Sequence, residues 1–238
     1  MSTEHAMSQA LDTMHSTAAD ALPLLARAEV YACLSRLIAS PQGELARAWL
    51  GHADLLERLQ IAAEALPYEF TPAELAAAAL GLDPEDPQIV AERVGQSFSA
   101  LFEVGDRGPP LAIREELAPG ANPAGKEEVV RFFEHFGYEL GEDYAWRPDH
   151  LSVLLEFMHF LTWHDAMATD ENLRSGFRNA QRDFLTRHLL WWLGDLSRAV
   201  AQRSDSHVLL KTTLSVIHSF IEDEKKWLDA STTVANGG

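Results

Sequence analysis

The sequence predicts an all-α protein that folds as a single-domain helical bundle. Apolar residues recur at helical spacing along almost the whole chain, and no stretch shows the alternation that is typical of a strand. With 238 residues, of which 47% are hydrophobic and 23% charged, the chain is long enough for one sizeable core. We expect this all-α domain over residues 21–230, between a flexible segment at 1–20 and a disordered tail at 231–238.

Proline and glycine residues divide the first half of the chain into helices. The expected helices are 21–39, which ends before Pro41, 43–65, which ends before Pro67, 72–80, which ends before Gly81, and 86–103, which lies between Pro84 and Gly105.

A long loop is expected next, from Gly105 to Asn122, and four helices after it. This loop is rich in proline and glycine, and a loop of this length in a compact domain is usually functional or mobile. The helices that follow are expected at 125–138, 150–168, 171–201 and 205–229.

The helix at 150–168 has the clearest start and the most apolar surface. Pro148 fixes its own φ and keeps Arg147 extended, so Asp149 is expected to be the N-cap. Leucine, valine, phenylalanine and methionine occupy most of the helix surface, which predicts that the helix is buried.

One polar stripe remains on this helix. Asp149, Ser152, Glu156 and His159 follow one another at intervals of three or four and lead to Trp163. Because a polar stripe on a buried helix must be paired internally or face a groove, we expect Glu156 and His159 to form hydrogen bonds inside the protein.

Two blocks of the sequence resemble a known family. The first is Pro148-Asp149-His150-Leu151 with the downstream Glu-Phe-Met at 156–158, and the second is the segment Phe98 to Pro110, with its Leu-Phe pair and Gly/Pro-rich end. Together they resemble the TorD/DmsD/NarJ chaperones, cytoplasmic maturation factors of molybdenum enzymes. The segments 126–136 and 181–190 are similar to the branch that serves type II dimethyl sulfoxide reductase-like enzymes.

The resemblance implies a chaperone without catalytic residues, metal or cofactor. Its partner would be the catalytic subunit of a molybdopterin-containing oxidoreductase, recognised through a twin-arginine signal peptide and held back from export until its cofactor is inserted. A receptor for an Arg pair and an apolar stretch needs carboxylates beside an apolar groove. The peptide-binding residues implied are Phe98, Leu101, Phe102, Glu103, Pro148, Asp149 and His150.

Composition limits the other partners and the location. The 36 acidic residues outnumber 19 basic ones, and the net charge of −17 argues against binding nucleic acid or an anionic membrane. No apolar stretch is long enough for a membrane span, and 1–20 does not read as a secretory signal. We expect a cytoplasmic monomer or homodimer, and Cys33, the only cysteine, as a buried thiol.

Other readings of particular residues remain. Glu156-x-x-His159 has the spacing of di-iron bundles, but no second such pair exists. The pair His164-Asp165 suggests an alternative function, an all-α metal-dependent phosphohydrolase, and a purely structural helical scaffold is a third possibility. Arg174, Arg178 and Arg182 are expected to form a solvated face. Trp191-Trp192 predicts core packing or a dimer contact.

Overall fold

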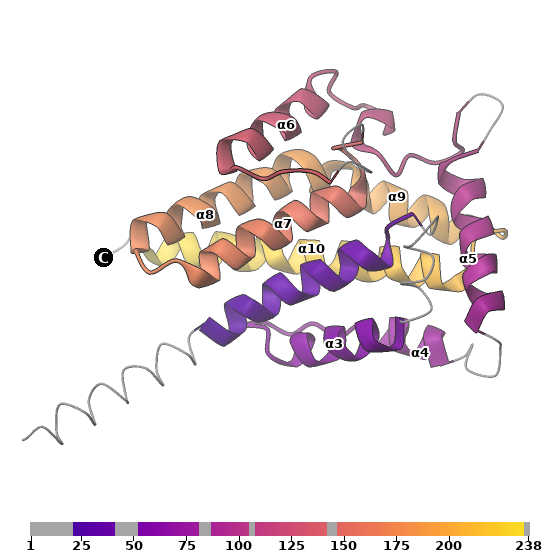
Figure 1. Cartoon of the computed structure of the whole chain (residues 1–238), viewed down its shortest axis with the longest axis horizontal. Helices are drawn as coiled ribbons and strands as arrows, with labels where there is room; N and C mark the ends of the chain where they lie inside the picture. The colour runs from indigo at the N-terminus through magenta and orange to yellow at the C-terminus, as the bar shows by residue number, and fades with distance from the viewer. Residues whose placement is uncertain (1–20, 41–51, 81–86, 105–107, 142–146, 236–238) are drawn as a thin grey trace, which may run out of the picture.

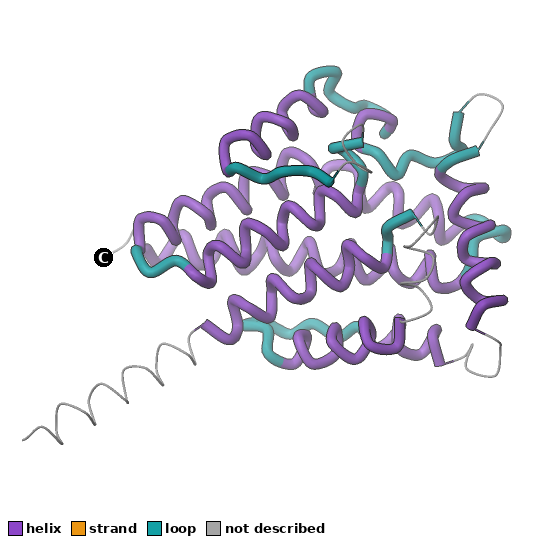
Figure 2. The backbone as a smooth tube through the Cα atoms, in the orientation of Figure 1, coloured by secondary structure: helices purple, strands orange, loops and turns teal. Residues whose placement is uncertain are grey.

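Helices and their connections make up the described part of the chain. The computed structural model describes residues 21–40, 52–80, 87–104, 108–141 and 147–235. Within these ranges no strand forms, and the one pair with bridge geometry joins Arg114 to His150 (Figure 2). The prediction of an all-α, single-domain fold is confirmed. The predicted flexible segment 1–20 lies outside the described residues.

The helices follow the predicted order. They are a helix at 21–37, α3 (His52–Glu64), α4 (Ala73–Leu80), α5 (Pro87–Phe102), α6 (Gly125–Phe136), α7 (Leu151–Met167), α8 (Glu171–Phe184), α9 (Leu190–Gln202) and α10 (Val208–Ala235). Two short elements join them: the 3₁₀ turn η1 (Glu115–Leu117) and the π-helix η3 (Leu185–Leu189).

The long helices lie lengthwise, with the shorter elements around them. Figure 1 shows the helix 21–37, α7, α8 and α10 running along the long axis of the molecule, α5 standing across one end and α6 lying over α7 and α8. The most extensive packing is between α7 and α8 and between α9 and α10. The loop between α5 and α6 reaches the start of α7, because Leu151 N donates to Ile113 O at 3.0 Å.

Helix α7 occupies the core. Its residues Leu151, Leu154, Phe157, Met158 and Leu161 are all fully buried. The ring of Phe157 meets six other aromatic side chains, which lie on α6, α7, α8 and the segment after α6: Phe132, Phe133, Phe136, Tyr138, Phe160 and Phe184. The sequence prediction that this helix is buried on most sides is confirmed.

Most element ends lie within three residues of the predicted ones, and two differences are larger. The expected helix 171–201 is interrupted by η3, where the chain makes a π turn between α8 and α9. Helix α10 continues to Ala235, past the predicted end at 229 and through most of the predicted disordered tail. The helical spacing of apolar residues becomes weak in this last turn, so the sequence prediction placed the end of the helix too early.

A buried network of charged side chains ties four helices together. Arg27, in the helix 21–37, contacts both carboxylate oxygens of Glu224 on α10 at 2.7 Å, and its Nη2 donates to Gln181 Oε1 on α8 at 2.6 Å. Its Nη1 lies 3.6 Å from Asp165 on α7. Burial raises the pKa of Asp165, while the nearby guanidinium groups of Arg178 and Arg27 oppose this rise.

Cys33 is buried, as expected, and burial raises the pKa of its thiol to about 12. A thiol with such a pKa stays protonated at neutral pH and is a poor nucleophile.

Among the helices described, none combines the length and the apolar character that a membrane span requires.

Candidate functional site

Four of the seven predicted peptide-binding residues line one small cleft. The cleft has a volume of about 140 Å³ and lies between the end of α5, the loop after it and the start of α7. We call it the α5–α7 cleft. Its lining residues are Phe98, Phe102, Glu103, Pro109, Ile113, Arg114, Leu117, Arg147 and His150. Segments about 50 positions apart in the sequence therefore meet in one place.

The other three predicted residues lie behind the cleft. Leu101 is buried in the core, and its carbonyl accepts a hydrogen bond from Leu111 N at 3.0 Å. Pro148 and Asp149 are buried as well and do not line the cleft. These residues support the walls rather than offer a surface to a ligand.

Asp149 joins the loop to the start of α7. Its Oδ1 lies 3.2 Å from Arg114 Nη2, and its Oδ2 accepts from Glu116 N at 3.0 Å. Its carbonyl also accepts from Glu115 N at 3.0 Å. The side chain is fully buried, so this carboxylate is already used to hold the loop in place.

The N-cap of α7 is His150, and the prediction that Asp149 caps the helix is wrong. His150 Nδ1 accepts from Ser152 N at 3.2 Å and lies 2.8 Å from Ser152 Oγ. The loop binds Asp149 from outside the helix, which leaves the next residue to cap it. Burial, together with the charges of Arg147 and Arg114, lowers the pKa of His150 to about 3, so the ring is neutral near pH 7.

Glu103 is the partly exposed carboxylate of the cleft. It follows the last residue of α5, and its Oε1 accepts from Ser40 Oγ at 2.8 Å. The rings of Phe98 and Phe102, one helical turn apart on α5, meet edge to face at 5.0 Å and form the apolar wall beside it. A carboxylate next to an aromatic wall is thus present, as expected.

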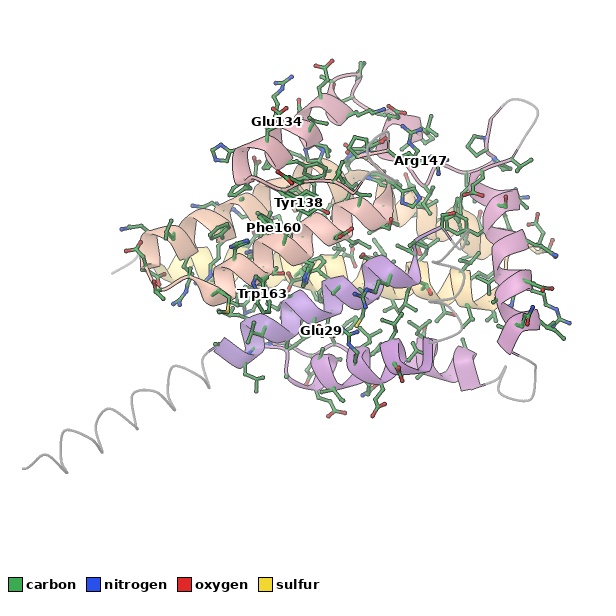
Figure 3. The ribbon with its side chains drawn as sticks, viewed as in Figure 1. Glu29, Glu134, Tyr138, Arg147, Phe160 and Trp163 are labelled. Carbon is green, nitrogen blue, oxygen red and sulfur yellow. The ribbon has the colours of Figure 1, made fainter. Side chains whose placement is uncertain are left out.

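Two arginines also line the cleft, and the sequence reasoning missed both. Arg114 is paired with Asp149 and Glu116, which compensates its charge. Arg147 lies beside the start of α7, as Figure 3 shows, while Phe160 and Trp163 lie further along the same helix. The signal that could have identified Arg114 is its place in the loop after the second sequence block, directly before the acidic pair Glu115 and Glu116.

The polar stripe on α7 faces a separate groove. Ser152, Glu156 and His159 line a space of about 270 Å³ against the helix 21–37. His159 Nδ1 lies 2.8 Å from Ala28 O, so the expected internal hydrogen bond is present for the histidine. Glu156 is paired as well, through a hydrogen bond with the Tyr138 hydroxyl, but it is exposed, so this bond does not lie inside the protein as expected.

The residues of the phosphohydrolase alternative, His164 and Asp165, make structural contacts with other side chains of the bundle. Asp165 is fully buried and contacts Arg27, Arg178 and Gln181, while the ring of His164 stacks against Phe177. Over the part of the chain that is described, no group of three or more potential metal ligands occurs. The contact of Arg178 with Asp165 at 3.3 Å also shows that the predicted solvated arginine face was wrong for this residue.

Trp191 and Trp192 have different surroundings, as their adjacency predicts. Trp192 is buried, and its indole N–H donates to His188 O at 2.8 Å. Trp191 keeps 36% of its surface exposed and donates to Glu115 Oε1 at 3.3 Å. Glu115 is itself buried and lies 3.0 Å from His188 Nδ1, a connection between the loop and η3 that the sequence did not reveal.

Comparisons with known proteins give a family and several relatives to which this chain is similar. A family model described as nitrate reductase delta subunit matches residues 63–198, which include all of the α5–α7 cleft and Trp191. The chain is 32% identical over 132 residues to the chlorate reductase assembly chaperone protein of Ideonella dechloratans, covering 54% of this chain and 68% of that one.

Other relatives are matched over a smaller share of their length. The selenate reductase assembly chaperone protein of Thauera selenatis is 35% identical over 116 residues, 48% of this chain and 60% of the relative. The perchlorate reductase assembly chaperone protein of Dechloromonas aromatica is 36% identical over 99 residues, 40% of this chain and 44% of the relative. These names describe assembly chaperones and not catalysts, and the present chain is likewise not an enzyme.

Proposed function

Because this chain belongs to the nitrate reductase delta subunit family, we propose that it is an assembly chaperone for the catalytic subunit of a molybdenum-containing oxidoreductase. We propose further that it acts in the cytoplasm and holds its client by a twin-arginine signal peptide while the cofactor is inserted, which delays export. The observation that carries this proposal is the α5–α7 cleft, where Glu103 stands beside the aromatic wall.

Glu103 and the net charge of the chain are the features that favour a cationic peptide. The Glu103 carboxylate accepts a hydrogen bond from the Ser40 hydroxyl at 2.8 Å, and a carboxylate has further lone pairs that can accept from a guanidinium group. An Arg can meet a carboxylate with two parallel hydrogen bonds. Of the two arginines that line the cleft, Arg114 is paired with Asp149 and Glu116. The net charge of −17 adds a long-range attraction for a basic leader.

Asp149 has a supporting role in this proposal. Since it is buried against Arg114 and the backbone of Glu116, it positions the loop that forms one side of the cleft. A direct contact between Asp149 and the peptide would require the loop to release it. We therefore assign the first contact with the Arg pair to Glu103.

Calorimetry with a synthetic leader peptide tests the proposal. The probe carries an Arg pair followed by a Leu- and Ala-rich stretch. Glu103→Gln should weaken its binding by roughly 10- to 150-fold, since a lost charge-assisted hydrogen bond is worth roughly 1.5–3 kcal/mol. The matched control is Glu64→Gln. It removes an exposed carboxylate of α3, at a position distant in the sequence from the residues of the cleft, and should leave the affinity for the peptide unchanged.

Peptide variants separate specific recognition from simple charge attraction. Replacing the Arg pair by Lys keeps the charge but removes the planar fork, so binding should weaken modestly. Placing Asp residues in the apolar stretch should nearly abolish binding. An affinity that follows peptide net charge alone, with Glu103→Gln and Glu64→Gln equal, would contradict the proposed function.

A further inference from the structure

A second, larger cleft adjoins the α5–α7 cleft. It has a volume of about 420 Å³ and lies between the loop of residues 108–119 and helix α9. Its wall is mostly apolar and includes Pro110, Leu111, Trp191, Leu196 and Ala199. We call it the Trp191 cleft. Pro109 and Leu117 line both clefts, so the two spaces lie on either side of the same short piece of loop.

The volumes show why one cleft is too small for a leader peptide. A protein cavity of about 150 Å³ holds a single benzene molecule. The α5–α7 cleft, at about 140 Å³, can therefore take one apolar side chain next to Glu103. The Trp191 cleft has three times this volume. An apolar stretch of several residues needs a space as large as the Trp191 cleft, next to the cleft that contains Glu103.

Trp191 is held in place before any ligand arrives. Its indole N–H donates to Glu115, which is 2% exposed and is also bound by His188, and the ring remains 36% exposed. The neighbouring Leu117 is 46% exposed. A fixed aromatic ring loses little side-chain entropy on binding, which increases the net gain from apolar contact. The π-helix η3 ends two residues before Trp191, and π turns often occur at functional sites.

We propose that the Trp191 cleft is the subsite for the apolar stretch of the client leader peptide, with the face of Trp191 as its main contact. This inference rests on the proposed function, and it adds the place where the leader's apolar residues bind. The peptide then lies across Pro109 and Leu117, with its Arg pair beside Glu103 and its apolar residues against α9. Continuity of the two clefts and their relative sizes select this occupant over an unrelated apolar partner.

The test compares two exposed tryptophans. Trp191→Ala should weaken binding of the synthetic leader peptide tenfold or more in calorimetry, and Trp191→Phe should restore most of the affinity because it keeps an aromatic face. Trp163, which is 46% exposed near the other end of α7, supplies the matched control, so Trp163→Ala should bind as the unmodified protein does. Circular dichroism checks that each variant is folded, and if Trp191→Ala does not fold, Leu117→Ser at the exposed edge of the same cleft takes its place and should weaken binding.

A second probe locates the contact on the peptide. With the apolar stretch replaced by Ser and Gly, the remaining affinity should be the same for the unmodified protein and for Trp191→Ala. Equal affinities of the original probe for Trp191→Ala and the unmodified protein, with Glu103→Gln still weakened, would overturn this inference and leave the proposed function intact. Loss of a dimer in Trp191→Ala without loss of peptide affinity, measured by light scattering, would also overturn it and assign the cleft to a second copy.

Discussion

Replacing Arg27 by methionine tests whether the buried charge network holds the bundle together. The Arg27 side chain is completely buried, with Glu224 at 2.7 Å, Gln181 at 2.6 Å and Asp165 at 3.6 Å. Its guanidinium carbon also lies 4.1 Å from the centre of the Trp227 ring. Methionine fills the space of the aliphatic stem but leaves the two carboxylates without this counter-charge.

The expected loss of stability is large because the partners cannot reach water. Removing one member of a buried ion pair costs about 3–5 kcal/mol. For a protein of this size, each kcal/mol corresponds to a shift of roughly 2–4 °C in the melting temperature. The melting temperature of Arg27→Met should therefore fall by roughly 6–20 °C.

Thermal and denaturant unfolding, followed by circular dichroism, measure this loss. The control is Arg58→Met, which breaks an exposed pair with Glu29, 44% and 34% exposed, and should cost less than about 1 kcal/mol. The deficit of Arg27→Met should shrink at acid pH, because burial raises the pKa of Asp165, and without the opposing charge of Arg27 this carboxyl binds a proton more readily in the folded state. Adding Glu224→Leu should recover most of the stability. A cost for Arg27→Met no larger than that for Arg58→Met would refute the reasoning.

Three further predictions concern α7. His150 has a pKa of about 3 in the folded protein against an ordinary value of 6.5, so its contribution is present above pH 6.5 and is lost as the pH falls towards 3. This loss of stability approaches about 1.4 kcal/mol per pH unit. His150→Asn keeps a capping side chain and should make the loss smaller. Equal slopes of unfolding free energy against pH for the variant and the unmodified protein would contradict this. Asp149→Ala should cost about 2–3 kcal/mol, since it strands Arg114 and a backbone N–H, and Asp149→Asn less; a cost near zero in urea unfolding would show that the loop is held by other contacts. Glu156→Ala, at an exposed position, should change stability by less than about 0.5 kcal/mol, and a loss above 1 kcal/mol would show that its contact with Tyr138 matters more than its exposure suggests.

The structure brings four of the seven predicted peptide-binding residues to the α5–α7 cleft and gives Asp149 a role that the sequence did not predict. The two sequence blocks around Phe98 and Pro148 meet in space, and Glu103, Phe102 and His150 line the cleft together. Asp149, in contrast, is neither the N-cap nor an open carboxylate. Its role depends on Arg114, and no local pattern shows that this arginine returns to the start of α7.

The sequence by itself determined the helices, their order and the burial of α7, because apolar spacing and proline or glycine breaks act between near neighbours in the chain. Only the tertiary structure decided which charges pair, as in the contact of Arg27 with Glu224, 197 positions away. It also decided that η3 makes a π turn and that Glu115 holds Trp191 beside the loop. The physical reason is that pairing of buried polar groups depends on where helices cross, and many crossings are compatible with the same apolar pattern.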